Sequence, residues 1–317
     1  MRRGSSGLSC LLAIDKPSGP SSHDVVNRLR RILSERRVGH AGTLDPAATG
    51  VLVVGVGQAT RLLGMLALDD KRYDARIAFG TSTDTDDAEG EAVREAAVPA
   101  RLAQPAVARA ALAALEGPCD QVPPAYSAIS VDGRRAYDRA RSGEKVELAT
   151  RRVTIHETRL KAVEMGTPLI WDCSFHVSKG TYVRSIARDL GESLGTAAHL
   201  CELRRISSGP IGLDHCTTLA ELELLGTKGA VGRALDPVGA LMLPRHELDA
   251  HELEAVAAGR RIACRPVMDP VSGTRLPRDG ERVCLTSGQR LMGVWEVRGE
   301  RLACVSNFPQ GIMGVRS

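Results

Sequence analysis

Two stretches of this chain alternate apolar and polar residues one by one, and this pattern restricts the fold more than any other in the sequence. They are YDARIAF, residues 73–79, and LIWDCSFHV, residues 169–177. Successive side chains of a β-strand point to opposite faces, so strict alternation is typical of a strand with one buried and one solvated face. Such strands belong to antiparallel sheets. The buried faces are predicted to carry Tyr73, Ala75, Ile77, Phe79, Leu169, Trp171, Cys173, Phe175 and Val177.

Other segments predict buried strands with helices placed irregularly among them. CLLAID (10–15) and VLVVGV (51–56) are short apolar runs typical of buried strands. Helical periodicity, a proline at a first helical position and glycines just past the ends predict helices over 24–37, 105–116 and 185–194. Strands dominate, and the helices do not alternate regularly with them. The fold class predicted is therefore α+β, around a mixed, largely antiparallel sheet.

The character of the chain changes after about residue 245. Residues 248–259 predict a short helix in which Asp249 and Glu252 occupy capping-box positions. A stretch rich in Pro, Gly and Arg follows, and then the short strands RVCLT, LMGVWEV and LACVS. We therefore predict a large domain over 1–245 and a small β-rich module over 246–317.

Composition and negative findings exclude several classes of protein. No apolar run approaches the ~20 residues that span a bilayer, and the apolar run LLAI after the N-terminal arginines is too short for a signal peptide. The 8 cysteines are scattered without a C-x-x-C pair, which indicates buried thiols in a reducing compartment. No H-x-x-x-H pair occurs, which argues against a zinc hydrolase. A cytoplasmic protein is expected.

Charge is distributed unevenly along the chain. The net charge is only +4, but residues 1–80 carry 12 Lys and Arg against 7 Asp and Glu, and residues 134–205 carry 14 against 9. Such surpluses suit a polyanion such as nucleic acid, although solvated surface arginines account for them nearly as often. TSTDTDDAEGE (81–91) lacks the glycine and closing glutamate of a calcium loop, so we interpret it as a solvated acidic turn.

The segment GHAGTLDPAATG, residues 39–50, contains one carboxylate, Asp45, directly before a proline. A residue before proline is displaced from helical geometry, so Asp45 is predicted to lie on a rigid, non-helical loop. Such a loop is a suitable place for a reactive group. The alternative is that Asp45 is an ordinary turn residue whose side chain accepts a neighbouring backbone N–H.

Five segments, taken in order, identify a resemblance. They are DKPSGPSSHDV (15–25), GHAGTLDPAATG (39–50), DKRYDA (70–75), SKGTYVRSIARDLG (178–191) and HLCELRR (199–205). From Leu11 to about Arg205 the chain resembles the TruB type of pseudouridine synthase, bacterial enzymes that convert a uridine of the tRNA T-loop, position 55, to its C-glycoside isomer. The resemblance implies a metal- and cofactor-independent isomerase that acts, as a monomer, on the T-arm of tRNA.

The resemblance also implies roles for individual residues. Asp45 matches the family's nucleophilic aspartate, Arg184 the arginine paired with that carboxylate, and Tyr73 the tyrosine that packs against the target uracil. Five further residues match binding positions of the family. His40 matches the histidine that contacts the displaced nucleotide, Tyr182 a residue of the nucleotide pocket, Leu203 the apolar residue beside the base, and Lys16 with Pro17 an element near the floor of the cleft.

The chemistry of the reaction agrees with the catalytic roles. Detaching a uracil from its ribose and rejoining it through carbon requires one ionised nucleophile or charge stabiliser. Burial would raise the pKa of Asp45, and an adjacent Arg184 would keep the carboxylate anionic; the alternative for Arg184 is a phosphate contact. Tyr73 is placed on the edge of an alternating strand, where stacking on a base is worth ~1–3 kcal/mol, unless it is a core aromatic residue. Three roles stay open for the Asp45 carboxylate: attack on the sugar, attack on the ring, and abstraction of a proton from the ribose.

The target base must leave the T-loop stack, at a cost of a few kcal/mol. His40 is expected to fill the vacated space, with Gly39 and Gly42 letting the backbone approach RNA closely; the alternative is a surface histidine bonded to its own loop.

The module at 246–317 stands where family members carry a PUA-type RNA-binding domain, and the basic segment 118–145 is interpreted as an RNA-facing insert. Two alternative functions stay open: an RNA-binding or tRNA-folding factor, and a pseudouridine synthase that acts on another RNA.

Overall fold

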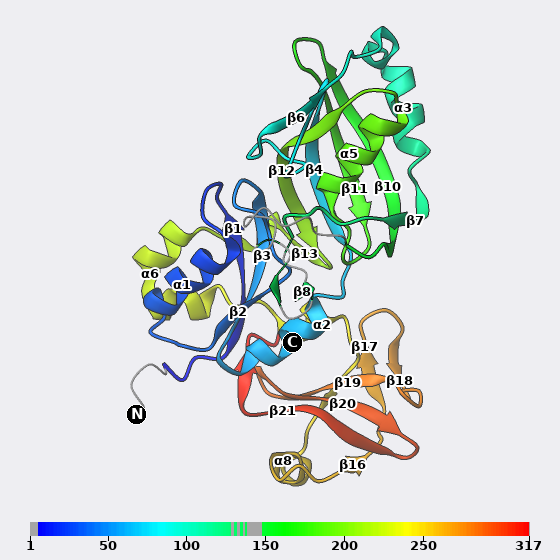
Figure 1. Cartoon of the computed structure of the whole chain (residues 1–317). Coiled ribbons are helices and arrows are strands. Elements are labelled where there is room, and N and C mark those ends of the chain that lie inside the picture. Colours follow the sequence, from blue (N-terminus) through cyan, green and yellow to red (C-terminus); the bar gives the residue numbers. More distant parts are fainter. Residues whose placement is uncertain (1–5, 128–129, 132–133, 136, 138–147, 317) are drawn as a thin grey trace. The chain divides into compact units, whose positions relative to one another are not determined.

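A computed structural model describes residues 6–127, 130–131, 134–135, 137 and 148–316 of the chain (Figure 1). Of the predicted insert at 118–145, residues 128–129, 132–133, 136 and 138–145 therefore lie outside the described residues. The chain forms two compact units. The first comprises Met1–Pro46, Gly50–Leu68 and Ser207–Ser317, and the second comprises Ala47–Thr49 and Asp69–Ile206. The predicted division at residue 245 stays a prediction.

The first unit begins with a buried antiparallel pair. Strands β1 (Cys10–Lys16) and β3 (Thr49–Val56) pair from Cys10 opposite Val56 to Lys16 opposite Gly50, which confirms the two predicted buried strands. β14 (Cys216–Thr217) joins β1 in parallel, and β2 (Val38–Ala41) joins β3 antiparallel. The connecting elements are η1 (Gly57–Leu62), α2 (Leu63–Leu66), β13 (Ile211–Gly212), η3 (Leu213–His215) and α7 (Pro237–Leu241).

Helices α1 (Ser22–Ile32) and α6 (Leu219–Gly232) pack together in this unit, α1 also against β2 and α6 also against β1 (Figure 1). The predicted range 24–37 was wrong at both ends. α1 begins earlier because the Ser21 side chain accepts from the Asp24 backbone while the Asp24 carboxylate accepts from the Ser21 backbone, a complete capping box. It ends earlier because Ser34 adopts a left-handed conformation, with φ of 48°.

A seven-stranded sheet forms the C-terminal part of the first unit, with the strand order β16-β21-β20-β19-β15-β17-β18. The three predicted strands correspond to β19, β20 and β21, and the predicted capping box opens α8. The stretch rich in Pro, Gly and Arg also forms a hairpin, β17–β18, which the sequence had not predicted. The bounds are β15 (Arg245–Glu247), α8 (Ala250–Ala257), β16 (Ile262–Ala263), β17 (Val267–Asp269), β18 (Gly273–Arg275), β19 (Arg282–Ser287), β20 (Arg290–Arg298) and β21 (Arg301–Met313).

Two hydrophobic cores stabilise the first unit. One lies within the C-terminal sheet and is centred on Trp295, which is fully buried. The other joins β1, β3, η1 and α2 to the C-terminal strands, with Leu11 and Val53 in the same cluster as Phe308 and Ile312. The Met313 N–H also donates to the Ser9 carbonyl over 2.9 Å. The C-terminal sheet therefore shares its core with the first strands of the chain.

The second unit is built on the strand order β12-β4-β11-β10-β7. β4 (Lys71–Phe79) and β11 (Leu169–Val177) pair antiparallel, with Tyr73 opposite Phe175, and β11 alternates buried and half-buried residues along its whole length. This confirms the predicted strands and their buried faces. The remaining bounds are β5 (Thr81–Thr83), β6 (Ala92–Glu95), η2 (Ala100–Ala103), β7 (Gly117–Gln121), β8 (Ser130–Val131), β9 (Arg134–Arg135), β10 (Arg151–Glu164) and β12 (Ala198–Ser208).

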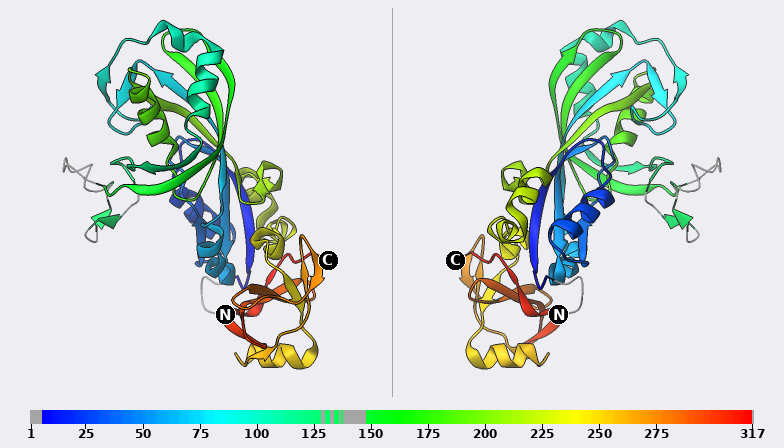
Figure 2. Two further views of the ribbon diagram at one scale, coloured as in Figure 1. Left: turned by 90° about the vertical axis from the view of Figure 1, so that its right-hand side faces the viewer. Right: turned by 90° about the vertical axis from the view of Figure 1, so that its left-hand side faces the viewer.

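Helices α3 (Pro105–Ala113) and α5 (Val183–Ser193) belong to this unit, and both were predicted to within a few residues. Figure 2 shows the long strands β10 and β11 side by side, with α3 against β10. The Trp171 ring lies 4.6 Å from that of Phe79, and its Nε1–H donates to the Leu102 carbonyl over 3.0 Å. Among the described strands, most pairs are antiparallel while β1–β14 and β15–β19 are parallel, so the α+β class with a mixed, largely antiparallel sheet is confirmed.

Candidate active site

Asp45 lies on the loop between β2 and β3, half-buried and outside any helix, as its position before Pro46 predicts. The residue before it is bonded twice to one side chain. The Leu44 N–H donates to Ser22 Oγ over 2.8 Å, and the Ser22 hydroxyl donates to the Leu44 carbonyl over 2.9 Å. Ser22 is the first residue of α1 and is 2% exposed. Helix α1 therefore holds the backbone directly before Asp45.

The residue after Asp45 is held as well. The Pro46 carbonyl accepts from Lys16 Nζ over 2.8 Å and from the Gly19 N–H over 2.9 Å. Lys16 is fully buried at the end of β1, and its ammonium also donates to the Pro17 carbonyl over 2.9 Å. Buried charged groups are costly unless they are hydrogen-bonded, so these carbonyls stabilise Lys16 while Lys16 positions the loop. The reading of Lys16 as a residue of the cleft floor stays a prediction.

His40, on β2 opposite Val54, is half-buried. The structure of the protein itself explains why the two neighbouring residues, Gly39 and Gly42, are glycines. A Cβ on Gly39 would lie 2.9 Å from Leu63 Cδ1, and Gly42 has φ of +87°, which L side chains rarely adopt. The expectation that these glycines admit RNA is therefore not needed to explain them.

Tyr73 is the third residue of β4, which lies between β12 and β11, so it is near one end of its strand and away from the edges of the sheet. The ring faces the same side as Phe175 and is 8% exposed. A cavity of about 180 Å³ borders it, lined also by Phe175, His176 and Ile206. Tyr73 is thus packed as a core aromatic residue that still borders a cavity.

Lys71 begins β4 and is 6% exposed. Burial, and after it the nearby charge of the buried Arg205, lower the pKa of its ammonium to about 8. Because the pKa in the unfolded chain is about 10.5, the unfolded state binds more protons between pH 8 and pH 10.5. The contribution of Lys71 to stability therefore rises with pH across this window.

This rise in stability with pH predicts how the variant Lys71→Met will differ from the wild-type chain. Relative to the variant, the wild-type chain is expected to gain up to about 3 kcal/mol in free energy of unfolding between pH 8 and pH 10.5. Urea unfolding of both proteins at the two pH values measures the gain. Lys228→Met serves as control, because Lys228 is an exposed lysine of α6. A constant difference between wild type and Lys71→Met across this range would contradict the assignment.

Tyr182 is the residue before α5, and its backbone is bonded at both polar groups to one buried side chain. The Tyr182 N–H donates to Gln121 Oε1 over 2.8 Å, and Gln121 Nε2–H donates to the Tyr182 carbonyl over 3.1 Å. The guanidinium of Arg151 lies 5.5 Å from the centre of the Tyr182 ring, a cation–π contact. Gln121, which the sequence had not singled out, thus fixes the start of α5.

Arg184 is the second residue of α5 and is 4% exposed. Its guanidinium donates to the Thr85 carbonyl and to the Tyr126 carbonyl, over 2.9 Å each, and lies 3.5 Å from Asp87 Oδ2. A planar guanidinium fixed by several acceptors is pre-organised for a further anion. Arg184 therefore connects α5 with the turn at 81–91 and with Tyr126.

The turn at 81–91 is only in part the solvated acidic turn that we predicted: Asp84, Glu89 and Glu91 are exposed, whereas Asp86 is not. Asp86 is 8% exposed, and its carboxylate lies 2.8 Å from the Arg188 guanidinium. Burial raises the pKa of Asp86, while the charges of Arg188 and Arg184 oppose this shift. Arg184 and Arg188 are one helical turn apart on α5, so one face of that helix meets two carboxylates of the turn. No local pattern in the sequence indicates this pairing.

The predicted site residues belong to two different units. Lys16, His40 and Asp45 belong to the first unit, where Lys16 and the Asp45 loop are joined. Tyr182 and Arg184 come together at the start of α5 in the second unit. Tyr73 on β4 and Leu203, half-buried on β12, belong to the second unit as well.

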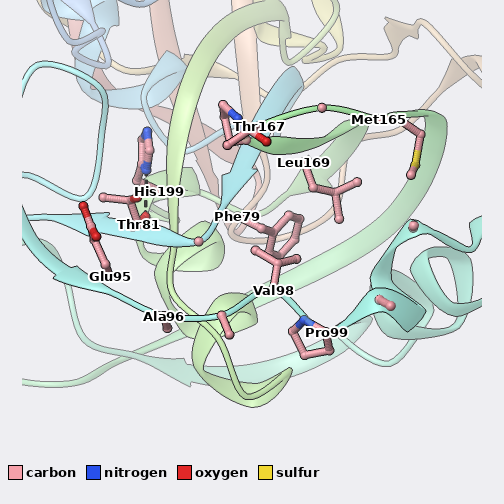
Figure 3. Close-up of a pocket in the computed structure, with 16 residues that line it drawn as sticks. Phe79, Thr81, Glu95, Ala96, Val98, Pro99, Met165, Thr167, Leu169 and His199 are labelled. Carbon is pink, nitrogen blue, oxygen red and sulfur yellow. Dashed lines mark hydrogen bonds between the residues drawn. The ribbon is translucent and has the colours of Figure 1, made fainter.

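The second unit also contains a pocket of about 970 Å³, shown in Figure 3. Its lining is mostly small and apolar, with Val98, Pro99 and Leu169 among the side chains, and none of the predicted site residues lines it. His199 Nδ1 lies 2.8 Å from the Thr81 carbonyl and is thus engaged with the protein backbone. We therefore do not assign the chemistry to this pocket.

The cysteines are free thiols, as expected, but only three are buried: Cys10, Cys173 and Cys284. Burial raises the pKa of Cys10 and of Cys173 to about 12, which makes these thiols unreactive. Cys304 is exposed, so the expectation of buried thiols was wrong for part of the set.

Among the described residues, no helix is both long and apolar enough to cross a membrane.

Comparison with known proteins places this geometry in a family. Residues 30–183 match the N-terminal domain of TruB family pseudouridylate synthases, and residues 184–242 match the C-terminal domain of tRNA pseudouridylate synthase B. A protein named tRNA pseudouridine synthase B from Arthrobacter sp. strain FB24 is 50% identical over 263 residues, which cover 81% of this chain and 83% of that protein. The chain belongs to the TruB family of pseudouridylate synthases.

Another TruB relative, tRNA pseudouridine synthase B from Nocardia farcinica, is 44% identical over 294 residues, 92% of this chain and 94% of the relative. The fold is similar to that in a crystal structure of a Cbf5-Nop10-Gar1 complex, with a TM-score of 0.67 at 24% identity over 98% of this chain and 86% of that chain. It is also similar to that in an H/ACA RNP bound to a substrate RNA containing 2'-deoxyuridine, with a TM-score of 0.66 at 23% identity over 96% of this chain and 86% of that chain. The TruB-type fold thus includes the C-terminal β-rich module.

Proposed function

We propose that this chain converts uridine to pseudouridine in tRNA, at position 55 of the T-loop. Membership of the TruB family carries the proposal, because relatives at 44–50% identity over most of their length bear the name tRNA pseudouridine synthase B. The sequence segment GHAGTLDPAATG supplies the reactive group on a loop bonded on both sides of Asp45. The alternative of an RNA-binding or tRNA-folding factor assigns no purpose to a carboxylate held in this way.

In the proposed reaction, the Asp45 carboxylate assists the breaking of the bond between uracil N1 and the ribose C1'. The uracil turns within the site and its C5 bonds to C1'; C5 then gives up its proton, and N1 takes up a proton in place of its lost bond to the ribose. Electrons and atoms balance without an oxidant or a metal, so we propose a cofactor-independent isomerase. Arg184 is proposed to keep Asp45 ionised, since a cation near a desolvated carboxylate lowers the carboxylate pKa.

The remaining residues are proposed to bind the nucleotide. Tyr73 would stack on the uracil from the cavity that it borders, with Tyr182 and Leu203 in the same nucleotide pocket. His40 would fill the space that the extruded nucleotide leaves in the T-loop. Lys16 would lie near the floor of that cleft. We propose that residues 246–317 form an RNA-binding module, that the monomeric chain contacts the T-arm, and that it acts in the cytoplasm.

The direct test is release of tritium from C5-labelled uridine in an unmodified tRNA transcript, because isomerisation leaves the mass of the RNA unchanged. We expect release of one equivalent per tRNA by the purified chain. A transcript with cytidine in place of U55 is the matched control and should release none. Binding of the tRNA without any tritium release would favour the tRNA-folding factor, and equal release from the U55C transcript would exclude the proposed position.

The contacts of Ser22 indicate a substitution that should change only how the Asp45 loop is held. Ser22→Ala removes both hydrogen bonds to Leu44 and should lower kcat about 10- to 100-fold, because a displacement near 1 Å in an active site can cost that much. Single-turnover tritium release measures the effect. Ser21→Ala is the matched control, since Ser21 caps the same helix without touching the Asp45 loop and should cost stability of about 1 kcal/mol but little kcat. Equal kcat values in the two variants would refute the positioning role of Ser22.

A further inference from the structure

Three side chains that could bind a metal ion meet in the second unit, apart from the residues of the proposed reaction. They are Asp70, just before β4, His156 on β10 and His176 on β11. Asp70 Oδ2 lies 3.2 Å from His156 Nε2 and 3.5 Å from His176 Nε2. The two imidazole rings are 4.8 Å apart between centroids. Two histidines thus aim the same ring nitrogen at one carboxylate oxygen.

The sheet produces this meeting through a β-bulge. On the ladder between β10 and β11, Ile155 is opposite Val177 while Glu157 is opposite His176, so His156 is an extra residue between two paired ones. Ile155 is buried, whereas His156 and Glu157 are both exposed. A bulge re-aims a side chain and bends its strand, and bulges are over-represented next to functional sites. Here the bulge turns His156 to the exposed face that carries His176.

Asp70 reaches the same face by strand alternation. Arg72 is opposite His176 on the β4–β11 ladder, and a residue two positions earlier than Arg72 points to the same side. Arg72 is itself paired with Glu157 over 3.0 Å. The nearest guanidinium on this face is therefore engaged with a carboxylate other than Asp70.

The distances fit one particular class of ion. Zn²⁺ binds histidine nitrogen and carboxylate oxygen at about 2.0–2.2 Å in a tetrahedron, which places two ligand atoms about 3.4 Å apart. The separations of 3.2 and 3.5 Å from Asp70 Oδ2 match this value. The three ligand atoms all lie within 4.8 Å of one another, which is close enough for one ion to bind all three once the side chains adjust to it.

We propose that Asp70, His156 and His176 bind one Zn²⁺ ion, with the remaining coordination position open to water. Two imidazoles and one carboxylate are a donor set that borderline first-row divalent metals prefer, whereas Mg²⁺ and Ca²⁺ prefer oxygen alone. The absence of an H-x-x-x-H pair does not bear on this site, because its ligands come from β10, from β11 and from the residue before β4. The ion is no part of the proposed isomerisation.

The test uses the untagged full-length chain, stripped with a chelator and titrated with Zn²⁺ in a calorimeter and with Co²⁺ in an absorption spectrometer. We expect one Zn²⁺ per chain, and with Co²⁺ the intense visible bands of four-coordinate geometry. The Co²⁺ spectrum should lack the near-ultraviolet charge-transfer band of a thiolate, which would appear if exposed cysteines bound the metal instead. His156→Ala and His176→Ala should each weaken binding about tenfold or more.

His251→Ala is the matched control, because His251 is an exposed histidine of the C-terminal module, and its affinity for Zn²⁺ should equal that of wild type. Thermal unfolding without metal verifies that the His156→Ala and His176→Ala chains are folded; if either is not, Asp70→Asn, which retains the side-chain shape, replaces it. Binding of Zn²⁺ that is as tight in His156→Ala and in His176→Ala as in wild type, or a thiolate band with Co²⁺, would overturn the proposal.

Discussion

Replacing Asp45 by asparagine is expected to lower the rate of tritium release by about 10⁴-fold or more, with the affinity for tRNA nearly unchanged. The amide has the shape of the carboxylate, but it carries no charge and is a poor nucleophile. Attack on the sugar, attack on the ring and abstraction of a ribose proton all require the ionised oxygen, so the variant should fail in each of these mechanisms. Single-turnover tritium release and filter binding of the same transcript measure the two quantities.

Asp214→Asn is the matched control for this prediction, because its carboxylate is 79% exposed and belongs to no part of the proposed site. It should retain the wild-type rate. Retained activity in Asp45→Asn, after mass spectrometry has excluded deamidation back to aspartate, would remove Asp45 from the mechanism while leaving the family assignment intact.

Phe308→Ala is expected to lower the free energy of unfolding by about 3–5 kcal/mol, the usual cost of removing a large aromatic ring from a packed core. Phe308 lies on β21, is fully buried, and packs in the cluster that contains Leu11 of β1 and Val53 of β3. Because that core is shared, amide hydrogen exchange in β1 should accelerate along with exchange in β21. Denaturant unfolding and residue-resolved exchange test the two effects.

Val305→Ala provides the comparison on the same strand. Val305 is 43% exposed, and its truncation should change the free energy of unfolding by no more than about 0.5 kcal/mol. If Phe308→Ala accelerated exchange in β21 but left β1 fully protected, the C-terminal sheet would be an independent module, in agreement with a boundary at residue 245.

Strand prediction succeeded where burial alternates strictly and failed where the ladder is irregular. β4 and β11 were evident because every second residue faces the core. β10, the neighbour of β11, was not predicted: its ladder has register shifts after Ile155 and after Leu160, and most of its residues are not buried. A shift moves the following side chains to the other face, so the period of two is lost from the sequence.

The candidate site was predictable to a similar degree. The loop with Asp45 follows from Asp-Pro geometry and from the family resemblance, and the structure has it outside any helix. The support of that loop by Ser22 and the support of Tyr182 by Gln121 were not predicted, since serine in a polar run and glutamine at a strand end have many other uses. The burial of Asp86 in the acidic turn was missed because the arginine that pairs with it is about 100 residues away.

The amino-acid sequence by itself determined the strands with regular alternation, the capping box of α8, the non-helical loop with Asp45 and membership of the TruB family. These features depend on residues a few positions apart, or on segments compared directly with relatives. Only the tertiary structure decided which side chains hold the Asp45 loop, that Asp86 is buried against Arg188, that β21 shares a core with β1, and that Asp70, His156 and His176 meet. Burial and strand register arise from contacts between distant segments, and those contacts form only when the chain is folded.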